Sequence, residues 1–262
     1  MNSEAPAGPR VIKIGGRAQG DDRLPAAIAA AARGGTSLCI VHGGGDEVSQ
    51  LQRQLGSAPT FLDGRRVTTE ADLAVVRMVL SGTVNKRLVG ALLDAGVAAA
   101  GVSGEDGALL TCRVYGDGAL GAVGDPDVVD PSLLRALFAA GFVPVVSPLG
   151  RFGDGRGCNV NGDDAAAAIA AALGADELLL VADVPGVLDA SGLRIVALDA
   201  EGAEELVTTH AARGGMIAKL EAARRALASG VSRVRIGDLT AIGDATAGTT
   251  IFPAGAHTSR SS

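Results

Sequence analysis

Short β-rich runs alternate with helix-like runs along this chain of 262 residues, and this alternation limits the folds that it can adopt. The strand-like segments are 10–14, 38–41, 97–102, 143–147, 178–182, 234–236 and 249–252, and the helix-like segments are 24–33, 46–55, 70–94, 131–140, 163–173 and 216–229. Neighbouring parallel strands need a crossover connection, which is usually a helix. We therefore predict an α/β protein with a mostly parallel central sheet.

Two regions depart from this alternation. We expect a hairpin over 109–125 and a glycine-rich loop over 150–157. A second α/β unit begins near Gly174. We therefore expect an N-terminal lobe over 1–174 and a C-terminal lobe over 175–262.

The composition disfavours several functional classes. The net charge of −6 is unlike that of a nucleic-acid-binding surface. No apolar run approaches the roughly 20 residues that span a bilayer, and the N-terminus lacks an apolar signal core. Cys39, Cys112 and Cys158 are too scattered for a disulfide framework or a metal site. We expect a cytoplasmic protein without nucleic-acid or membrane partners.

Lysine is rare in this chain. Of 23 Lys and Arg residues, only Lys13, Lys86 and Lys219 are lysine. Lys carries a compact point charge and Arg a broad planar fork, so a retained lysine indicates a task that Arg cannot perform. Lys13 and Lys219 stand in glycine-rich contexts, and a phosphoryl group in transfer suits such a charge. The alternative is that base composition left three lysines at random positions. Lys86 lies in a predicted helix, where we expect a structural or interface role.

A histidine and three glycines, 42–45, stand between a predicted strand and a helix that we expect Asp46 to cap. Backbone N–H groups at a helix start bind anions, and glycines let a ligand approach them closely. Gly15 and Gly16 follow the neighbouring strand, so both loops are predicted to meet at one edge of the sheet. We favour an anion site here over a simple tight turn. His42 is either catalytic or a side chain that hydrogen-bonds the turn.

Two polar runs are candidates for binding a carboxylate. Arg65 and Arg66 precede a predicted helix, and paired guanidinium groups can clamp a carboxylate, although a solvated surface pair fits the pattern equally well. Asn159, Asn161 and Asp163 stand at alternate positions before another helix. Capping needs only one such residue, so the three together indicate a polar site.

Eight ordered motifs make the chain resemble the amino acid kinase family over about residues 10–252. They are K-I-G-G at 13–16, H-G-G-G at 42–45, F-L-D-G-R-R-V-T at 61–68, M-V-L-S-G-T-V-N-K at 78–86, G-V-S-G-E-D-G at 101–107, N-V-N-G-D at 159–163, A-D-V-P-G-V-L at 182–188 and G-G-M-I-A-K at 214–219. The resemblance implies a three-layer αβα sandwich with a mostly parallel central sheet, the amino acid kinase fold. In it, the N-terminal lobe binds the acyl-amino-acid and forms the dimer, and the C-terminal lobe binds ATP.

The resemblance also implies a role for each matching site residue. Lys13 and Lys219 would stabilise the transferring phosphoryl group, and Asp163 would orient both lysines. The donors of backbone N–H groups to that group would be Gly16, Gly44 and Gly45, and the substrate carboxylate would be held by Arg66 and Asn159. The nucleotide site would be lined by Asp183, Val184, Pro185, Gly186, Val187 and Leu188, and closed by Ala211, Ala212 and Arg213.

The motifs are most similar to those of family members that transfer a phosphoryl group from ATP to the side-chain carboxylate of N-acetyl-L-glutamate, a step of arginine biosynthesis. A carboxylate with a pKa of about 4.3 is ionised at pH 7, so this acceptor needs no general base. Mg²⁺ would arrive with ATP, and no metal site of the protein's own is expected. We expect a homodimer insensitive to arginine, because Pro6, Gly8 and Pro9 disfavour an additional N-terminal helix.

Two other functions fit the same motifs. A related kinase acts on aminoadipate or glutamate attached to an acidic carrier protein. It should present a basic docking surface, which the net charge of −6 disfavours. A non-catalytic nucleotide or metabolite sensor on the same fold should have lost one of Lys13, Lys219 and Asp163, and all three are present.

Overall fold

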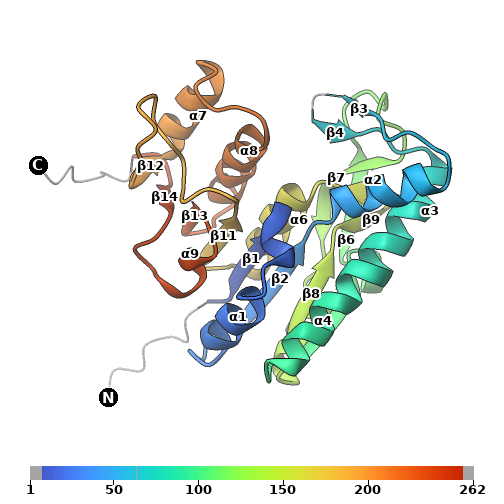
Figure 1. The fold of residues 1–262 in the computed structure, drawn as a ribbon, viewed down its shortest axis with the longest axis horizontal. Helices are drawn as coiled ribbons and strands as arrows, with labels where there is room; N and C mark the ends of the chain where they lie inside the picture. Colours follow the sequence, from blue (N-terminus) through green and yellow to red (C-terminus); the bar gives the residue numbers. More distant parts are fainter. Residues whose placement is uncertain (1–7, 63, 256–262) are drawn as a thin grey trace, which may run out of the picture.

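An eight-stranded sheet forms the centre of the computed structural model, which describes residues 8–62 and 64–255 (Figure 1). Its strand order is β12-β14-β13-β11-β1-β2-β8-β5, and among these neighbours the β13–β14 pair is antiparallel and the others are parallel. The strands are β1 (Arg10–Ile14), β2 (Leu38–His42), β5 (Ala99–Ser103), β8 (Val143–Ser147), β11 (Glu177–Val181), β12 (Ala197–Asp199), β13 (Arg233–Gly237) and β14 (Thr249–Phe252). The predicted mostly parallel sheet is confirmed.

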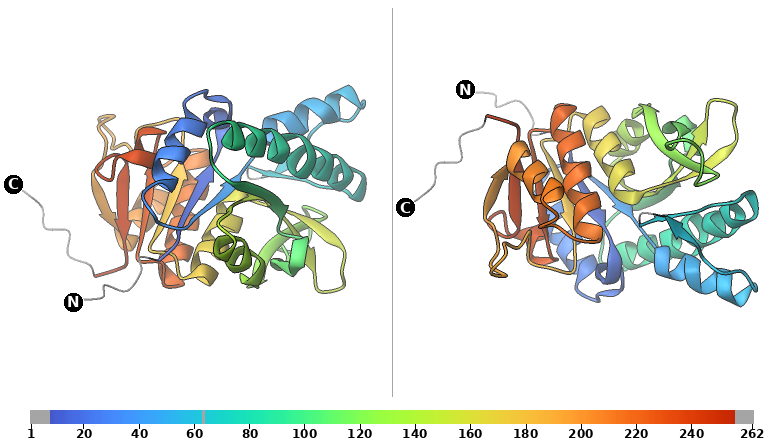
Figure 2. Two further views of the ribbon diagram at one scale, coloured as in Figure 1. Left: turned by 90° about the horizontal axis from the view of Figure 1, so that it is seen from below. Right: turned by 90° about the horizontal axis from the view of Figure 1, so that it is seen from above.

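Helices cover both faces of the sheet, which gives the predicted three layers (Figure 2). One face is covered by α1 (Leu24–Ala32), α4 (Asn85–Asp94) and α9 (Thr240–Gly243), and the other by α5 (Ser132–Ala139), α6 (Gly162–Leu173), α7 (Ala200–Thr208) and α8 (Gly215–Ala228). Side chains alternate along β1, so Val11 packs in one layer and Ile12 and Ile14 pack in the other. The apolar strands are therefore buried on both sides, as parallel sheets require.

The N-terminal half extends beyond the sheet (Figure 1). The extension contains α2 (Gly45–Gln54), α3 (Glu70–Arg77), a π-helical segment (Met78–Val84), the hairpin β3 (Phe61–Leu62) and β4 (Arg65–Arg66), and a closed four-stranded barrel of β6 (Leu110–Val114), β7 (Val123–Val129), β9 (Leu149–Phe152) and β10 (Gly157–Val160). Apolar side chains of α2, α3 and the π-helical segment form a core cluster of their own. Residues of β4 and β10 line one cavity within this extension.

Most predicted elements are present, with ends that differ by at most two residues from the prediction. Two expectations are wrong. The expected glycine-rich loop over 150–157 contains the ends of β9 and β10, which pair in antiparallel register around a short turn. Asp46 does not cap α2, because Gly44 is the N-cap and Asp46 lies in the first turn. The hairpin β3–β4, β12, α7 and α9 were not predicted.

Two expectations stay as predictions. The sheet crosses the expected lobe boundary, because Gly174 ends α6 and the following β11 pairs with β1. The predicted lobes 1–174 and 175–262 are therefore not separately folded domains, and the division stays a prediction about which part binds which substrate. Pro6 lies outside the described residues, and the expectation about the N-terminal segment is not addressed by the structure. Within the described ranges, no helix combines the length and the apolar character of a membrane span.

A buried glutamate ties three central strands together at the edge opposite the glycine loops. Glu177 of β11 accepts from Arg10 of β1 at 2.6 Å and from Arg233 and Arg235 of β13 at 2.9 and 3.0 Å. Burial alone would raise the pKa of Glu177, but the charges and hydrogen bonds of the arginines outweigh burial and lower it. The charged form of this side chain therefore stabilises the folded state.

We expect Glu177→Gln to destabilise the fold by about 3 kcal/mol, because removing one partner of a buried ion pair leaves the others uncompensated. Urea unfolding at pH 7 measures this difference. The pKa of Glu177 is lowered in the folded state, so its contribution is present above the ordinary glutamate pKa and is lost as the pH falls through the folded value. The difference in the free energy of unfolding between the wild type and Glu177→Gln should therefore become smaller in acid. Equal stability of both proteins at pH 7 would contradict this role.

Candidate active site

Two lysines from opposite ends of the chain converge on one buried carboxylate. The Nζ atom of Lys13, at the end of β1, lies 3.0 Å from Oδ1 of Asp163. The Nζ atom of Lys219, on α8, lies 3.1 Å from the same oxygen. The structure thus brings together the three residues for which the family resemblance implied a joint role.

The local sequence explains this convergence. Side chains alternate along β1, so Lys13 points to the same face as Val11, which is the face that α6 covers. Asn161 is the N-cap of α6, and its Oδ1 accepts from the backbone N–H groups of Asp163 and Asp164 at 2.8 and 3.3 Å. Because Asn161 caps the helix, the Asp163 carboxylate is available to the two lysines.

Glycines leave the space that the cluster needs. A Cβ atom on Gly15 would lie 2.6 Å from Nζ of Lys13, and one on Gly162 would lie 3.1 Å from Cε of the same lysine. Gly16 has φ +55°, and a Cβ atom there would lie 2.9 Å from Oδ2 of Asp183. A side chain at either position of this loop would therefore displace a charged side chain, and Gly16 in addition has a backbone conformation that favours glycine.

Burial and charge oppose each other at this cluster. Burial alone would raise the pKa of Asp163, but the charges of Lys13 and Lys219 outweigh burial and lower it. Burial and the charge of Lys13 lower the pKa of Lys219 against the opposing effect of Asp163. Two ammonium groups on one carboxylate leave one positive charge uncompensated within the cluster. That excess charge in a largely buried site suits an anion such as a phosphoryl group.

His42 hydrogen-bonds the glycine loop and is neutral. Burial lowers its pKa to about 4. Its Nδ1 lies 2.7 Å from the carbonyl oxygen of Gly43, and its Nε2 lies 3.1 Å from Nδ2 of Asn85. A carbonyl oxygen only accepts, and Nδ2 of Asn85 also donates to the Val145 carbonyl at 2.8 Å, so Nδ1 of His42 carries the proton. Of the two alternatives for His42, the geometry favours the side chain that holds the turn.

The glycine loop leads directly into α2. Gly44 is its N-cap with φ +139°, a conformation that favours glycine. The N–H group of Gly43 donates to the Ile14 carbonyl at 3.1 Å and is already used. The N–H groups of Gly44 and Gly45 are among those at the start of α2 that have no partner within the helix and can bind an anion.

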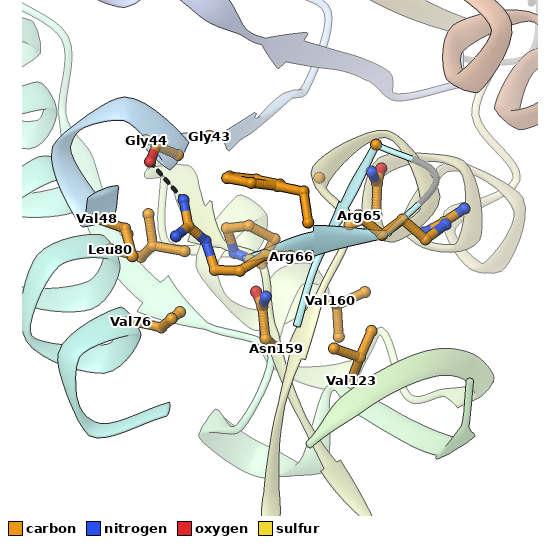
Figure 3. Close-up of a pocket in the computed structure, with 16 residues that line it drawn as sticks. Gly43, Gly44, Val48, Arg65, Arg66, Val76, Leu80, Val123, Asn159 and Val160 are labelled. Atoms are coloured by element: carbon orange, nitrogen blue, oxygen red, sulfur yellow. Dashed lines mark hydrogen bonds between the residues drawn. The ribbon is translucent and has the colours of Figure 1, made fainter. Parts of the chain in front are cut away.

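A cavity of about 170 Å³ opens beside this loop (Figure 3). Arg66 of β4 projects into it and donates from Nη2 to the Gly45 carbonyl and to Ser49 Oγ, both at 2.7 Å. Nη1 of Arg66 donates to Oε1 of Gln52, and the guanidinium carbon lies 4.8 Å from the centre of the Phe61 ring. Arg66 is thereby held at the wall of the cavity.

Asn159 of β10 also lines the cavity, and its Nδ2 donates to Thr68 Oγ1 at 3.1 Å. Arg66 and Asn159 were predicted from the sequence, but Ser49 and Gln52, which fix Arg66, were not. These two polar residues lie on the buried face of α2 with Val48. Buried polar positions on an amphipathic helix were the signal that could have revealed them.

The predicted nucleotide residues lie outside this cavity. Residues 183–188 follow β11, where the N–H group of Val187 donates to Thr249 Oγ1 at 2.8 Å. Residues 211–213 join α7 to α8 and precede Gly214, the N-cap of the helix that carries Lys219. The structure thus places one segment at the end of a central strand and the other at the start of the lysine helix.

The fold and the lysine cluster define the class of this protein. The chain belongs to the amino acid kinase family, whose family model matches residues 9–238. Its relatives include two proteins named acetylglutamate kinase. That of Jannaschia sp. strain CCS1 is 45% identical over 84% of this chain and 79% of its own length, and that of Geobacillus kaustophilus strain HTA426 is 44% identical over 86% and 88%.

A solved structure has the same overall fold. The smu.665 protein of Streptococcus mutans UA159 matches with a TM-score of 0.84 and 30% identity, over 93% of this chain and 98% of its own. The predicted three-layer fold of the amino acid kinase family is therefore confirmed by this structural match and by the family model.

We expect the His42 ring to stay neutral from pH 8 down to pH 5, because burial lowers its pKa to about 4. The ring protons of His42 in NMR spectra, assigned by comparison with His42→Gln, should not shift over this range. The pKa of His42 is lower in the folded state than in the unfolded chain, so the unfolded chain binds a proton first. The free energy of unfolding should therefore decrease as the pH falls from about 6.5 towards 4. A titration midpoint near 6.5 would contradict the buried, proton-donating arrangement.

Proposed function

We propose that this chain is an acetylglutamate kinase, which transfers a phosphoryl group from ATP to the side-chain carboxylate of N-acetyl-L-glutamate in arginine biosynthesis. The names of the relatives support the choice of acceptor. The observation that carries the proposal is the buried cluster of Lys13, Asp163 and Lys219 beside a cavity lined by Arg66. Site chemistry of this kind, and not the fold alone, supports a transferase.

Arg66 and Asn159 would hold the α-carboxylate end of the acceptor, since both line the cavity and both carry N–H donors. The side-chain carboxylate of the acceptor would then face the glycine loop and the lysines. That carboxylate is ionised at pH 7, given an ordinary pKa of about 4.3, so no residue needs to remove a proton. Positioning of the acceptor carboxylate next to the transferring phosphoryl group is the main contribution of the protein at this end.

Lys13 and Lys219 would neutralise the charge that develops on the transferring phosphoryl group, and Asp163 would hold both ammonium groups in place. The N–H groups of Gly16, Gly44 and Gly45 would donate to the oxygens of the same group. The uncompensated positive charge of the cluster is what makes these residues fit a nucleotide phosphate. Residues 183–188 and 211–213 would hold the nucleotide, and Mg²⁺ would enter with the phosphates of ATP, as is usual for this ion.

Two alternatives are less well supported. A kinase for carrier-linked aminoadipate or glutamate would share the cluster, but the names of the relatives and the net charge of −6 favour the free acceptor. A non-catalytic sensor would not need two lysines on one carboxylate at 3.0 and 3.1 Å. Neither alternative predicts turnover with free acetylglutamate in the assay that follows.

The proposal is tested by ADP release with MgATP and, in separate reactions, N-acetyl-L-glutamate, L-glutamate and L-aspartate. Hydroxylamine traps an acyl phosphate as a hydroxamate. We expect turnover and hydroxamate with acetylglutamate alone. No turnover with any of the three would refute the proposal, and ADP release with glutamate or aminoadipate attached to a carrier protein would then separate a carrier-linked kinase from a sensor.

We expect Lys219→Arg to lower kcat about 100-fold or more with the fold intact, because the planar guanidinium cannot take the place of a compact ammonium group. Steady-state kinetics measure kcat, and circular dichroism and the Tm report the fold. Lys86→Arg is the matched control, since Lys86 on α4 donates to Asn85 and Gly101 outside the cavity. An unchanged kcat in Lys219→Arg would rule out the compact-charge mechanism.

The proposal includes a cytoplasmic homodimer that arginine does not inhibit. The family resemblance supports the dimer, and the three cysteines, which are free and buried, suit a reducing compartment. Light scattering after gel filtration should give twice the chain mass of 25.9 kDa. A hexamer, or strong inhibition by arginine, would contradict this part of the proposal.

A further inference from the structure

Asp164, the neighbour of Asp163 in α6, makes ion pairs that the proposed mechanism does not use. Its side chain is 4% exposed, and its Oδ2 accepts from Nη1 of Arg65 at 2.7 Å. Its Oδ1 accepts from Nη2 of Arg225. Arg65 belongs to the β3–β4 hairpin and Arg225 to α8. One carboxylate thus joins the hairpin that lines the acceptor cavity to the helix that carries Lys219.

Alternation along β4 gives its two arginines different partners. Both residues line the cavity, but Arg66 points towards the glycine loop, and the Arg65 side chain extends in the opposite direction (Figure 3) and pairs with Asp164. The guanidinium carbon of Arg65 lies 4.3 Å from the centre of the ring of Tyr115, the only tyrosine in the chain. Stacking and the ion pair together fix the plane of this guanidinium group, and the Arg65 side chain is 12% exposed.

The local needs of α6 do not explain Asp164. Asn161 already caps the helix, and Asp163 already receives the two lysines. Burial raises the pKa of Asp164 although the charges of Arg225 and Arg65 oppose it, so an ionised carboxylate here has a desolvation cost. That cost is offset by two arginines from two different elements, which indicates a connecting role.

We propose that Asp164 is a positioning residue that couples the acceptor cavity to Lys219. Through Arg65 it fixes β4, and with β4 the side chain of Arg66 at the cavity wall. Through Arg225 it fixes α8, and with α8 the approach of Lys219 to Asp163. This inference rests on the proposed function, since it assigns Arg66 to acceptor binding and Lys219 to phosphoryl transfer.

The test compares Asp164→Asn, Arg65→Met and Arg225→Met in the hydroxamate assay. We expect Arg65→Met to raise the KM for acetylglutamate about tenfold with an unchanged KM for MgATP, and Arg225→Met to lower kcat about tenfold. Asp164→Asn should show both effects. Adding Arg65→Met to Asp164→Asn should raise the acceptor KM no further, because both changes break the same connection.

Arg77→Met is the matched control. It removes another arginine–carboxylate pair between elements, Arg77 with Glu105 at 2.5 Å, outside the cavity. We expect all three kinetic constants of this control to stay within about twofold of the wild type. Wild-type constants in Asp164→Asn, or effects of Arg65→Met and Asp164→Asn that multiply independently, would overturn the coupling.

Hydrogen exchange separates this inference from the proposed function, because it needs no substrate. Amides of the β3–β4 hairpin should exchange about fivefold faster in Asp164→Asn than in the wild type or in Arg77→Met. If the wild type makes no hydroxamate, the proposed function fails, and faster hairpin exchange would still support the connection through Asp164. Equal exchange in all three proteins would overturn it whatever the activity.

Discussion

The carboxylate of Asp163, shared by two lysine ammonium groups, is the interaction on which the rest of the site depends. One carboxylate and two ammonium groups are buried together here. The desolvation cost of such burial is offset only when the charges are paired at short distance. The surrounding residues serve that pairing: Asn161 caps the helix in place of Asp163, and Gly15 and Gly162 leave room for the Lys13 side chain. The remaining positive charge of the cluster then defines what the site can bind.

Two consecutive acidic residues at the start of α6 have separate tasks. Asp163 faces β1 and receives lysines, whereas Asp164 faces the hairpin and receives arginines. The pairing follows the chemistry of the cations. A lysine presents a point charge, whereas an arginine presents a planar group that can stack on an aromatic ring and donate several hydrogen bonds. Asp163 pairs with Lys219 of α8, and Asp164 pairs with Arg225 of the same helix. The position of α8 is therefore linked to both aspartates.

The main elements could be predicted from the sequence because buried parallel strands and amphipathic helices have distinct periods. Lys13 and Lys219 could be singled out because lysine is so rare in the chain, and the motif around Asp163 completed the cluster. The β3–β4 hairpin could not be predicted, since strands of two residues carry no period.

The contacts that fix the arginines were also beyond the sequence. Gln52 and Ser49 meet Arg66, and Asp164 meets Arg65, across distances that only the tertiary structure closes. The prediction that Asp46 caps α2 was wrong for a related reason. Gly44 reaches φ +139°, a backbone state that no side-chain rule for capping considers. Sequence patterns therefore identify the residues of the lysine cluster better than the residues that fix the arginines.

The alanine-rich body of α6 has a consequence for how this enzyme can change over evolution. Ala165, Ala166 and Ala170 are fully buried and carry the smallest side chain that still favours a helix. Their size affects how closely α6 packs against its neighbours, which include β1, β7 and α8, and so the separation between the β1 lysine and the first turn of α6. A larger residue at any of the three would push the helix outwards without touching a charged group. Substitutions at these core positions are thus limited by the charged residues one turn away. We expect the three alanines to vary less than the need for a small apolar side chain alone would require.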